Sequence, residues 1–465
     1  MTTFAGGISN AFSAADSNTG HMNVKNVSFI AAAMCCSFVA TNWGSAQSTN
    51  FIVTSSPTVA AKPSCVAVAD LNGDNKPDLI CSSGIINGTS GALTVLTNDG
   101  AGGFSTSATF TFSSPVFSVV ATDVNGDEKP DVACLMGTSV TIFTNNGSGT
   151  LGSNNTFSVS FAGHEIGPQS LATADLNGDA HPDLLVAPAA IYTNNGSGKF
   201  ALNTNFSLAT AAQLAAVGSF AWSGSTDVVF GGGANLDPSL FEIFVNNGKG
   251  VLTSNFTFTS GENAMSVLPA DSNCDGKTDL ACYDIVTRTI EVFTNLGNAT
   301  FFKSSNSVPG FFTNVSWLAA ADLNQDKRVD LISVDPTANT VMVLTNNGSG
   351  SFGSNDTLNV GARPVFVVVA DINGDGKPDL ITANQTDNTL TILTNATQIP
   401  QPPLTIVLTG NQSAVFWPSN RWNYVLQTTT DLASGNWTAV TNGTVNICIT
   451  VSNAAPAAFY RLQPN

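Results

Sequence analysis

Charged and reactive side chains are scarce in this sequence. Charged residues make up 10% of its 465 positions, and it has only three histidines and four tyrosines. No GxSxG or HExxH motif and no phosphate-cradling glycine loop occurs. The formal charge of -17 argues against a nucleic acid or an anionic membrane surface as partner. The composition therefore leaves few candidates for catalysis.

Long hydrophobic runs are also absent. The longest, VSFIAAAMCCSFVA at 27–40, has about fourteen residues, which is too short to span a bilayer comfortably. Lys25 precedes it and the small residues at 44–46 follow it, as in an export signal. We expect residues 1–46 to contain a signal peptide, for which Met22 is a better start than Met1. The mature chain is then secreted, extracellular or associated with the cell envelope, without a transmembrane segment.

Cysteine is too sparse for a dense disulfide framework. Six Cys residues follow the export signal, and most stand inside apolar strand patterns, where a small buried thiol is the usual case. Cys65 and Cys81 flank the first acidic turn almost symmetrically, so a cross-strand disulfide between them stays open. No Cys/His spacing indicates zinc.

An acidic nonapeptide, in contrast, recurs along the chain. Its copies begin at Asp70 (DLNGDNKPD), Asp123, Asp175, Asp271, Asp322 and Asp371, with spacings of 53, 52, 96, 51 and 49 residues. The gap of 96 spans two periods, and a degenerate copy, SFAWSGSTD at 219–227, lies inside it and keeps only the last acid. The chain therefore contains seven repeats of about fifty residues.

Each repeat reads as four strands. An apolar strand, the acidic turn, two more apolar strands, a glycine-rich turn such as TNNGSGSF (345–352) and a last strand follow one another. This predicts an all-β fold, a seven-bladed β-propeller over 47–395 with four-stranded blades. The seventh repeat stops after three strands, and the spare strand FIVTSS (51–56) predicts a 3+1 closure that leaves no open edge.

The remaining residues change character. The stretch ATQIPQPP at 396–403 reads as a Pro-rich linker. Residues 404–465 carry Trp417, Trp422 and Trp437 among alternating strands, which predicts a separate small β-sandwich-like module.

The nonapeptide has the chemistry of a cation site. Asp, Asn, Asp and Asp stand at positions 1, 3, 5 and 9, while position 7 is cationic and would offer its backbone carbonyl with its charged head pointing away. Oxygen donors on a flexible loop favour calcium, about six structural Ca²⁺ ions in all. No Glu stands at position 12, which excludes an EF-hand. Solvated Asx-type turns are the alternative, and six copies in register count against it.

The predicted ligands are Asp70, Asn72, Asp74, Lys76 and Asp78; Asp123, Asn125, Asp127, Lys129 and Asp131; Asp175, Asn177, Asp179, His181 and Asp183; Asp271, Asn273, Asp275, Lys277 and Asp279; Asp322, Asn324, Asp326, Arg328 and Asp330; and Asp371, Asn373, Asp375, Lys377 and Asp379. The aspartates at positions 1, 5 and 9 of these loops make up 18 of the 32 acidic residues, so much of the negative charge belongs to them.

The DxNGDxxPD string over residues 47–395 resembles the FG-GAP/VCBS repeats of integrin α-subunit propellers and of many secreted bacterial proteins. That resemblance implies a seven-bladed propeller with calcium in the hairpin between strands one and two of a blade. In the degenerate copy, Ser219, Ala221 and Ser223 replace three ligands, which puts its calcium in doubt.

Together these features favour a calcium-binding adhesion or binding protein for an extracellular protein or polysaccharide. The alternative is a lectin or a polysaccharide lyase or hydrolase on a propeller scaffold. His164 beside Glu165 is the only candidate acid–base pair, and an exposed loop histidine explains it better. Trp222 and Trp317 could stack on sugars, although packing explains them more simply. Recognition is expected at the unlike loops 85–91, 231–239, 283–288 and 334–340.

Overall fold

The computed structural model describes residues 22–23, 49–84, 88–159, 170–187, 190–205, 214–221, 224–232, 239–260, 264–304, 315, 317–397, 405–409, 412–416, 424–429, 438–439, 448–452 and 459–464. The chain divides into two compact units, Gly44–Thr397 and a second one formed by Met1–Trp43 with Gln398–Asn465. The described residues contain no helix, and so none that is able to cross a membrane.

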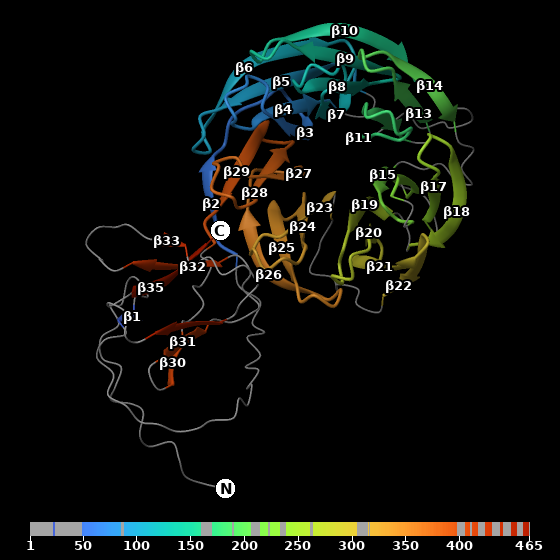
Figure 1. Ribbon diagram of the computed structural model, residues 1–465. Coiled ribbons are helices and arrows are strands. Elements are labelled where there is room, and N and C mark those ends of the chain that lie inside the picture. The colour runs from blue at the N-terminus through green and yellow to red at the C-terminus, as the bar shows by residue number, and fades with distance from the viewer. Residues whose placement is uncertain are drawn as a thin grey trace. The chain divides into compact units, whose positions relative to one another are not determined.

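The unit Gly44–Thr397 is a ring of seven antiparallel four-stranded sheets (Figure 1). Blades 1 to 3 consist of β3 (Pro63–Ala69), β4 (Asp78–Ser83), β5 (Gly91–Asn98) and β6 (Phe104–Phe112); β7 (Val116–Thr122), β8 (Asp131–Met136), β9 (Ser139–Asn145) and β10 (Leu151–Ser158); and β11 (Leu171–Ala174), β12 (Asp183–Val186), β13 (Ala190–Asn194) and β14 (Phe200–Asn205). The first strand of each blade lies innermost (Figure 1).

Blades 4 to 6 repeat this order. They consist of β15 (Leu214–Gly218), β16 (Asp227–Gly231), β17 (Leu240–Asn246) and β18 (Leu252–Thr259); β19 (Ala264–Ala270), β20 (Asp279–Asp284), β21 (Thr289–Gly297) and β22 (Thr300–Lys303); and β23 (Trp317–Ala321), β24 (Asp330–Asp335), β25 (Thr340–Asn346) and β26 (Phe352–Asn359). The degenerate repeat therefore still forms a complete blade.

Blade 7 closes the ring with strands from both ends of the unit. Its inner strands are β27 (Pro364–Ala370), β28 (Asp379–Asn384) and β29 (Thr389–Asn395), and its outer strand is β2 (Phe51–Ser55). Phe51 pairs with Asn395 and Val53 with Leu393 in the antiparallel register. The predicted seven-bladed propeller with 3+1 closure is confirmed.

The core consists of layers between neighbouring blades. Seven clusters of buried apolar side chains lie in the described part of the ring, and each joins two adjacent blades. Second strands such as β4 are buried at every residue because both faces of each sheet pack against a neighbour. This explains why the second and third strands read as continuous apolar runs, as strands buried on both faces do.

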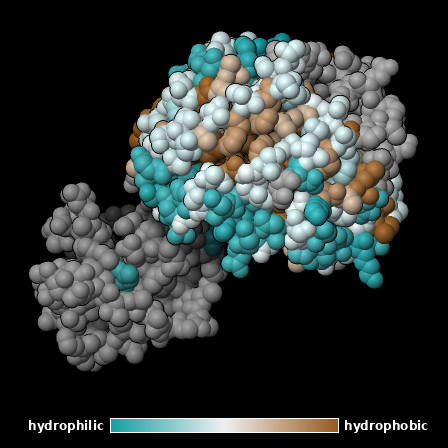
Figure 2. All heavy atoms as spheres, turned by 90° about the horizontal axis from the view of Figure 1, so that it is seen from above, coloured by the Kyte–Doolittle hydropathy of each residue, from teal (hydrophilic) through white to brown (hydrophobic). Residues whose placement is uncertain are grey.

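Aromatic side chains extend this packing outward. Phe110 of β6 lies 5.8 Å from Phe143 of the next blade, and Phe258 of β18 lies 4.4 Å from Phe293, between ring centroids. The surface beyond is mixed: Figure 2 shows apolar residues gathered in the middle of the visible face, with neutral and hydrophilic residues around them.

Successive hairpins of a blade alternate between the two ends of its strands. The acidic loops, between first and second strands, therefore share one face with the glycine-rich turns between third and fourth strands, and we call this the acidic face. The turns between second and third strands lie on the other, which we call the opposite face. The acidic loops thus stand where the sequence placed them, at the end of each blade's first strand.

In the second unit, the described strands form two sheets. One has the order β1 (Met22–Asn23), β35 (Phe459–Pro464), β32 (Tyr424–Thr429) and β33 (Thr438–Ala439), and the other β30 (Thr405–Thr409), β31 (Gln412–Phe416) and β34 (Cys448–Ser452). The sandwich packing predicted for 404–465 and the signal peptide predicted for 1–46 stay predictions, because most of these residues lie outside the described ranges.

Candidate functional site

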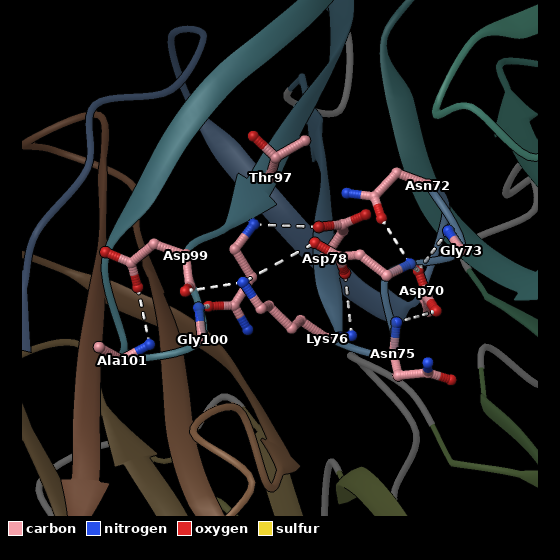
Figure 3. A network of polar contacts seen from close by, with 12 residues as sticks. Asp70, Asn72, Gly73, Asn75, Lys76, Asp78, Thr97, Asp99, Gly100 and Ala101 are labelled. Atoms are coloured by element: carbon pink, nitrogen blue, oxygen red, sulfur yellow. Dashed lines mark hydrogen bonds and ion pairs between the residues drawn. The ribbon is translucent and has the colours of Figure 1, made fainter.

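The acidic loop of blade 1 is a series of turns held by its own side chains (Figure 3). The Asp70 carboxylate accepts hydrogen bonds from the backbone N–H groups of Gly73 and Asn75, both at 2.7 Å. Asn72 Oδ1 accepts one from the N–H of Asp74 at 2.9 Å. Gly73 and Asn75 have left-handed φ angles of 76° and 61°, which turn the chain back around the Asp70 carboxylate.

The same turns recur in all six intact loops. The first-position carboxylate accepts the N–H of the sixth residue at 2.7–2.9 Å in each loop. The third-position Asn accepts the N–H of the fifth residue at 2.9–3.0 Å. The loops are therefore Asx turns, in which the side-chain oxygens of positions 1 and 3 hold the loop backbone through hydrogen bonds.

The donor chemistry of these loops fits calcium. Positions 1, 3 and 5 supply only oxygen donors, and each carboxylate oxygen keeps lone-pair capacity beyond the amide bond it accepts. Within the described ranges, no three Asp, Glu, His or Cys side chains already converge on one point. The 30 predicted ligands, including the position-7 carbonyls, therefore stay a prediction.

The cationic side chains at position 7 differ from the expectation that they point away. In five loops the charged nitrogen of Lys or Arg lies 3.0–4.0 Å from Oδ2 of the fifth-position carboxylate. The cause is local: Oδ1 of Asp74 accepts the backbone N–H of Lys76 at 3.0 Å, which brings the Lys76 side chain alongside the carboxylate. Lys76 Nζ also reaches the carbonyl of Asp99 at 2.9 Å (Figure 3).

The ninth-position aspartate is buried, and both of its oxygens accept backbone hydrogen bonds. Asp78 is 0% exposed; its Oδ2 accepts the N–H of Leu71 at 3.1 Å and its Oδ1 accepts the N–H of Asn98 at 3.0 Å. The same two bonds, at 2.7–3.2 Å, occur in every other blade, at Asp131, Asp183, Asp227, Asp279, Asp330 and Asp379.

Burial affects the protonation of these carboxyls. It raises the pKa of six of the seven, Asp78, Asp131, Asp183, Asp279, Asp330 and Asp379, while the accepted N–H bonds act in the opposite direction. Asp330 is the extreme case, because burial raises its pKa to about 7 and the nearby Asp326 and Asp322 carboxylates add to the effect.

The asparagine at the end of each third strand connects neighbouring blades. Asn145 Nδ2 in blade 2 donates to the carbonyl of Leu71, the second residue of the blade 1 loop, at 2.9 Å. Equivalent bonds of 2.7–2.9 Å join every pair of adjacent blades, and their donors are Asn98, Asn145, Asn194, Asn246, Asn295, Asn346 and Asn395.

These bonds form a closed circuit, which we call the Asp–Asn ring. Within blade 1, the peptide N–H of Leu71 donates to Asp78, and the Leu71 carbonyl accepts from Asn145 of blade 2. The backbone N–H of Asn145 donates to Asp131 of its own blade at 2.8 Å, and the pattern repeats around the propeller. It returns to its start when Asn98 donates to Ile372 of blade 7 at 2.7 Å.

The ring explains what the degenerate turn of blade 4 has kept. Asp227 Oδ2 accepts N–H bonds from Phe220 and Ala221 at 2.9 and 2.7 Å, and its Oδ1 accepts that of Asn246 at 2.9 Å. Blade 4 has thus lost the oxygens of positions 1, 3 and 5 but not its place in the ring. Phe220 is fully buried and meets Phe301 of blade 5 edge to face, at 5.8 Å between centroids.

The Asp–Asn ring is not among the predictions from the sequence, although the residues that form it recur in every repeat. All seven repeats, the degenerate one included, have an Asp before the second strand and an Asn at the end of the third. From the sequence alone, this Asp is predicted to be a ligand and this Asn to be part of a turn. An alternating pattern does not show which groups a buried side chain contacts.

No disulfide joins Cys65 and Cys81, the pairing that the sequence left open. Cys81 pairs with Val66 and Cys65 with Ser82, so the two side chains leave opposite faces of the same sheet. Cys65 packs in the layer toward blade 2, and Cys81 packs in the layer toward blade 7. Both are free and buried, and burial raises the pKa of the Cys65 thiol to about 11.

The other candidates separate into packing residues and residues outside the described ranges. Trp317 begins β23 and packs against Phe366 of blade 7, with 4.7 Å between ring centroids. His164 with Glu165, and Trp222, lie outside the described residues. Loops 85–91 and 231–239 are described only in part.

Two of the unlike loops share one backbone shape. The turns after β20 and β24 end on residues with left-handed φ, Arg288 (57°) and Asn339 (60°), and Asn388 (57°) ends the matching turn of blade 7. Asn339 Oδ1 accepts the N–H of Arg363 at 2.8 Å, and Asn388 Oδ1 accepts that of Lys62 at 2.9 Å, each across a blade boundary. The opposite face therefore carries different side chains on a repeated frame.

Comparison with known protein families matches three stretches of the chain, 70–134, 123–186 and 322–382, to the FG-GAP-like repeat. Each stretch runs from one acidic loop into a following second strand. The chain carries FG-GAP-like repeats. The resemblance of the acidic nonapeptides to this family is thereby confirmed, and the structure places them in a seven-bladed propeller.

Solved structures similar to this chain have low sequence identity to it. BBS1N, solved in complex with ARL6DN, is 13% identical, with a TM-score of 0.54 over 75% of this chain and 97% of that one. A Lactobacillus plantarum protein gives 12% identity and a TM-score of 0.49 over 66% and 88%. An Agrocybe aegerita lectin specific for non-reducing terminal N-acetylglucosamine gives 19% and 0.45 over 64% and 81%.

At these identities the likeness shows the fold alone. The search of curated proteins found no match.

Proposed function

We propose that this chain is a secreted, calcium-stabilised propeller that serves as a binding or adhesion scaffold for an extracellular protein or carbohydrate. The observation that supports it most is the recurrence of one oxygen-rich loop at the same place in six blades, each with the same Asx turns. A single such loop is explained by turn formation, whereas six copies with the same three oxygen positions point to a shared ligand.

Calcium has a structural task in this proposal. Each intact loop brings the acids of positions 1 and 5 close together at the end of a blade, and a cation offsets their mutual repulsion. Extracellular calcium modules bind with dissociation constants of about 10⁻⁴–10⁻³ M. At ten times the dissociation constant, each site adds about 1.4 kcal/mol, so six independent sites add about 8 kcal/mol.

The test is a pair of thermal melts with an accompanying titration. We expect EDTA to lower the melting temperature by many degrees, excess Ca²⁺ to restore it, and calorimetric titration to count about six sites. Mg²⁺ at the same concentration should restore much less, because it demands near-ideal octahedral geometry. Identical melts with EDTA and with Ca²⁺ would remove the calcium part of the proposal.

Recognition is assigned to the opposite face. Its turns carry unlike side chains on a backbone fixed across blade boundaries, which is a usual arrangement for binding loops on a rigid scaffold. The similar structure of BBS1N was solved in complex with ARL6DN, which is compatible with a protein partner for this fold.

A glycan array combined with a turnover assay on acidic polysaccharides separates the remaining alternatives. Binding without turnover supports the lectin or adhesion function, and turnover would establish the polysaccharide-active enzyme instead. Substitution of Val286, which is 54% exposed in the blade 5 turn, by Asp should weaken binding if this face is used. The matched change Val251→Asp, at a site 57% exposed in the blade 4 glycine-rich turn on the acidic face, should not.

A further inference from the structure

We propose that the asparagine ending each third strand is a positioning residue for the acidic loop of the preceding blade, so that the calcium affinity of a loop depends on its neighbour. This inference rests on the proposed function, since it concerns the same six loops. It goes beyond that function by giving a role in cation binding to side chains of another blade, none of which is a predicted ligand.

The contacts in blades 1 and 2 illustrate the proposal. Leu71 stands between the first- and third-position ligands of loop 1. Its carbonyl accepts two hydrogen bonds from blade 2, from Asn145 Nδ2 at 2.9 Å and from the N–H of Gly149 at 2.8 Å. Its own N–H donates to Asp78 at 3.1 Å. Hydrogen bonds therefore fix both the N–H and the C=O of Leu71. They also fix the directions in which the side chains of the two flanking ligands leave the backbone.

The turn of the next blade also packs directly on the loop. A Cβ added to Gly149 would lie 3.7 Å from Cβ of Asn72, which is van der Waals contact distance, so the turn lies next to this ligand. In blades 3 and 4 the approach is closer, because a Cβ on Gly178 would lie 2.7 Å from the carbonyl oxygen of Gly248. The acidic loops of blades 1 and 3 thus each pack against the glycine-rich turn of the next blade.

Blade 4 supplies a natural control. Its turn lacks the ligands of positions 1, 3 and 5, yet blade 5 braces it in the same way. The Phe220 carbonyl accepts from Asn295 Nδ2 at 2.9 Å and from the N–H of Ala299 at 3.0 Å. Asn145 and Asn295 therefore brace the same position of the preceding turn, but only Asn145 braces a loop with a full set of oxygen donors. Asn295 Nδ2 also donates to the carbonyl of Thr278 in its own blade at 3.0 Å.

The experiment compares Asn145→Ala with Asn295→Ala in the full chain. In EDTA, both variants should melt below the wild type, because each loses a donor to the carbonyl of the preceding turn; Asn295→Ala also loses the bond to Thr278 and should be at least as destabilised as Asn145→Ala. In a calcium titration, Asn295→Ala removes no bond to the residue between a first- and a third-position ligand, so its sites should stay closer to those of the wild type. Asn145→Ala should show one site weakened about tenfold, the effect of losing one positioning hydrogen bond.

A measurement without metal tests the same point. In EDTA, hydrogen exchange at the amides of Gly73 and Asn75, which the Asp70 carboxylate holds, should be faster in Asn145→Ala than in Asn295→Ala. If either Ala variant fails to fold, Asn145→Asp and Asn295→Asp replace the pair. They keep the side-chain oxygen that accepts the N–H of Gly147 or Gly297 and replace the donor by a carboxylate oxygen, so the added charge is the same in both variants.

The outcomes separate the two proposals. A wild type that binds calcium, together with an Asn145→Ala variant whose sites all keep their affinity, overturns the inference and leaves the proposed function standing. Equal weakening of calcium binding in both variants also overturns it, because the effect would then be general destabilisation. A wild type that binds no calcium overturns both.

Discussion

At the scale of single residues, two aspartates of the same nonapeptide have different environments. The side chain of Asp74 at position 5 is 39% exposed, whereas Asp78 at position 9 is 0% exposed and accepts two backbone hydrogen bonds. The exposed carboxylate is free to meet a cation from solvent. The buried one holds the start of the second strand and the end of the third together whether or not a cation is present.

Asp227 is the clearest test of this structural role, because blade 4 has no other acid in its turn. Asp227→Ala removes the carboxylate that accepts three buried backbone N–H groups, and we expect a loss of about 3 kcal/mol in the free energy of unfolding. The measurement is urea unfolding in EDTA. The calcium dependence of stability should stay that of the wild type.

The matched control for that variant is Asp74→Asn, at an exposed position of an intact loop. It should change stability in EDTA by about 0.5 kcal/mol or less and reduce the gain from calcium. An Asp227→Ala chain as stable as the wild type would contradict the structural role of the ninth aspartate.

The raised pKa of Asp330 predicts a pH dependence. Its folded pKa of about 7 lies above the ordinary carboxyl value, so the folded chain binds a proton that the unfolded chain has released between about pH 4 and pH 7. The contribution to stability is therefore full below about pH 4 and is lost as the pH rises through about 7. In EDTA, unfolding at about pH 5 should require more urea than at about pH 8, as far as Asp330 is concerned.

Asp330→Asn should reduce that difference, since an amide does not titrate in this range. The relevant quantity is the change in unfolding midpoint between the two pH values, which does not depend on how far the substitution shifts both. An undiminished difference in the variant would assign the pH dependence to other groups, such as the five other buried carboxyls with raised pKa.

At the scale of elements, strand β2 closes the ring without a covalent bond to its partner β29. Beyond the strand pairing, the Asn50 carbonyl accepts the N–H of Ala396 at 2.7 Å, and the hydroxyl of Ser55 donates to the carbonyl of Gly102 in blade 1 at 2.7 Å. The strand thus touches both sides of the closure, and without it β29 would be an open edge.

A chain beginning at Pro57 should therefore melt well below the full propeller and self-associate through the exposed edge of β29. Addition of a synthetic peptide of residues 47–57 should restore the melting temperature and the monomer in a saturable way, as size-exclusion chromatography would show. A scrambled peptide of the same composition is the control. Equal stability of the truncated and full chains would refute the role of β2.

The elements were the part of the fold that the sequence could predict. A period of about fifty residues counts the blades, and the incomplete last repeat together with FIVTSS indicates the closure. The ligand question is different, because Asp70 and Asp78 belong to one motif and only three-dimensional contacts show that Asp70 is half-buried and Asp78 is fully enclosed. The position of the Lys76 head likewise depends on a backbone bond that no spacing reveals.

At the scale of the whole molecule, all layers between neighbouring blades are apolar, but they differ in how the chain crosses them. Every gap except the one between blades 7 and 1 is crossed by chain that runs from a fourth strand into the first strand of the next blade. The gap between blades 7 and 1 has such a crossing only while β2 is paired with β29.

The buried thiols allow this difference between the layers to be measured, because a thiol becomes reactive when the layer around it opens. Cys81 lies in the layer between blades 7 and 1, and Cys282 lies in that between blades 4 and 5. In a chain with Cys274→Gly and Cys448→Ser, a thiol reagent in rising urea should modify Cys81 first and Cys282 later, as peptide mass spectrometry would record. Simultaneous labelling would mean that the propeller comes apart everywhere at once. Cys81 and Cys282 thus report on the opening of two different layers of the ring.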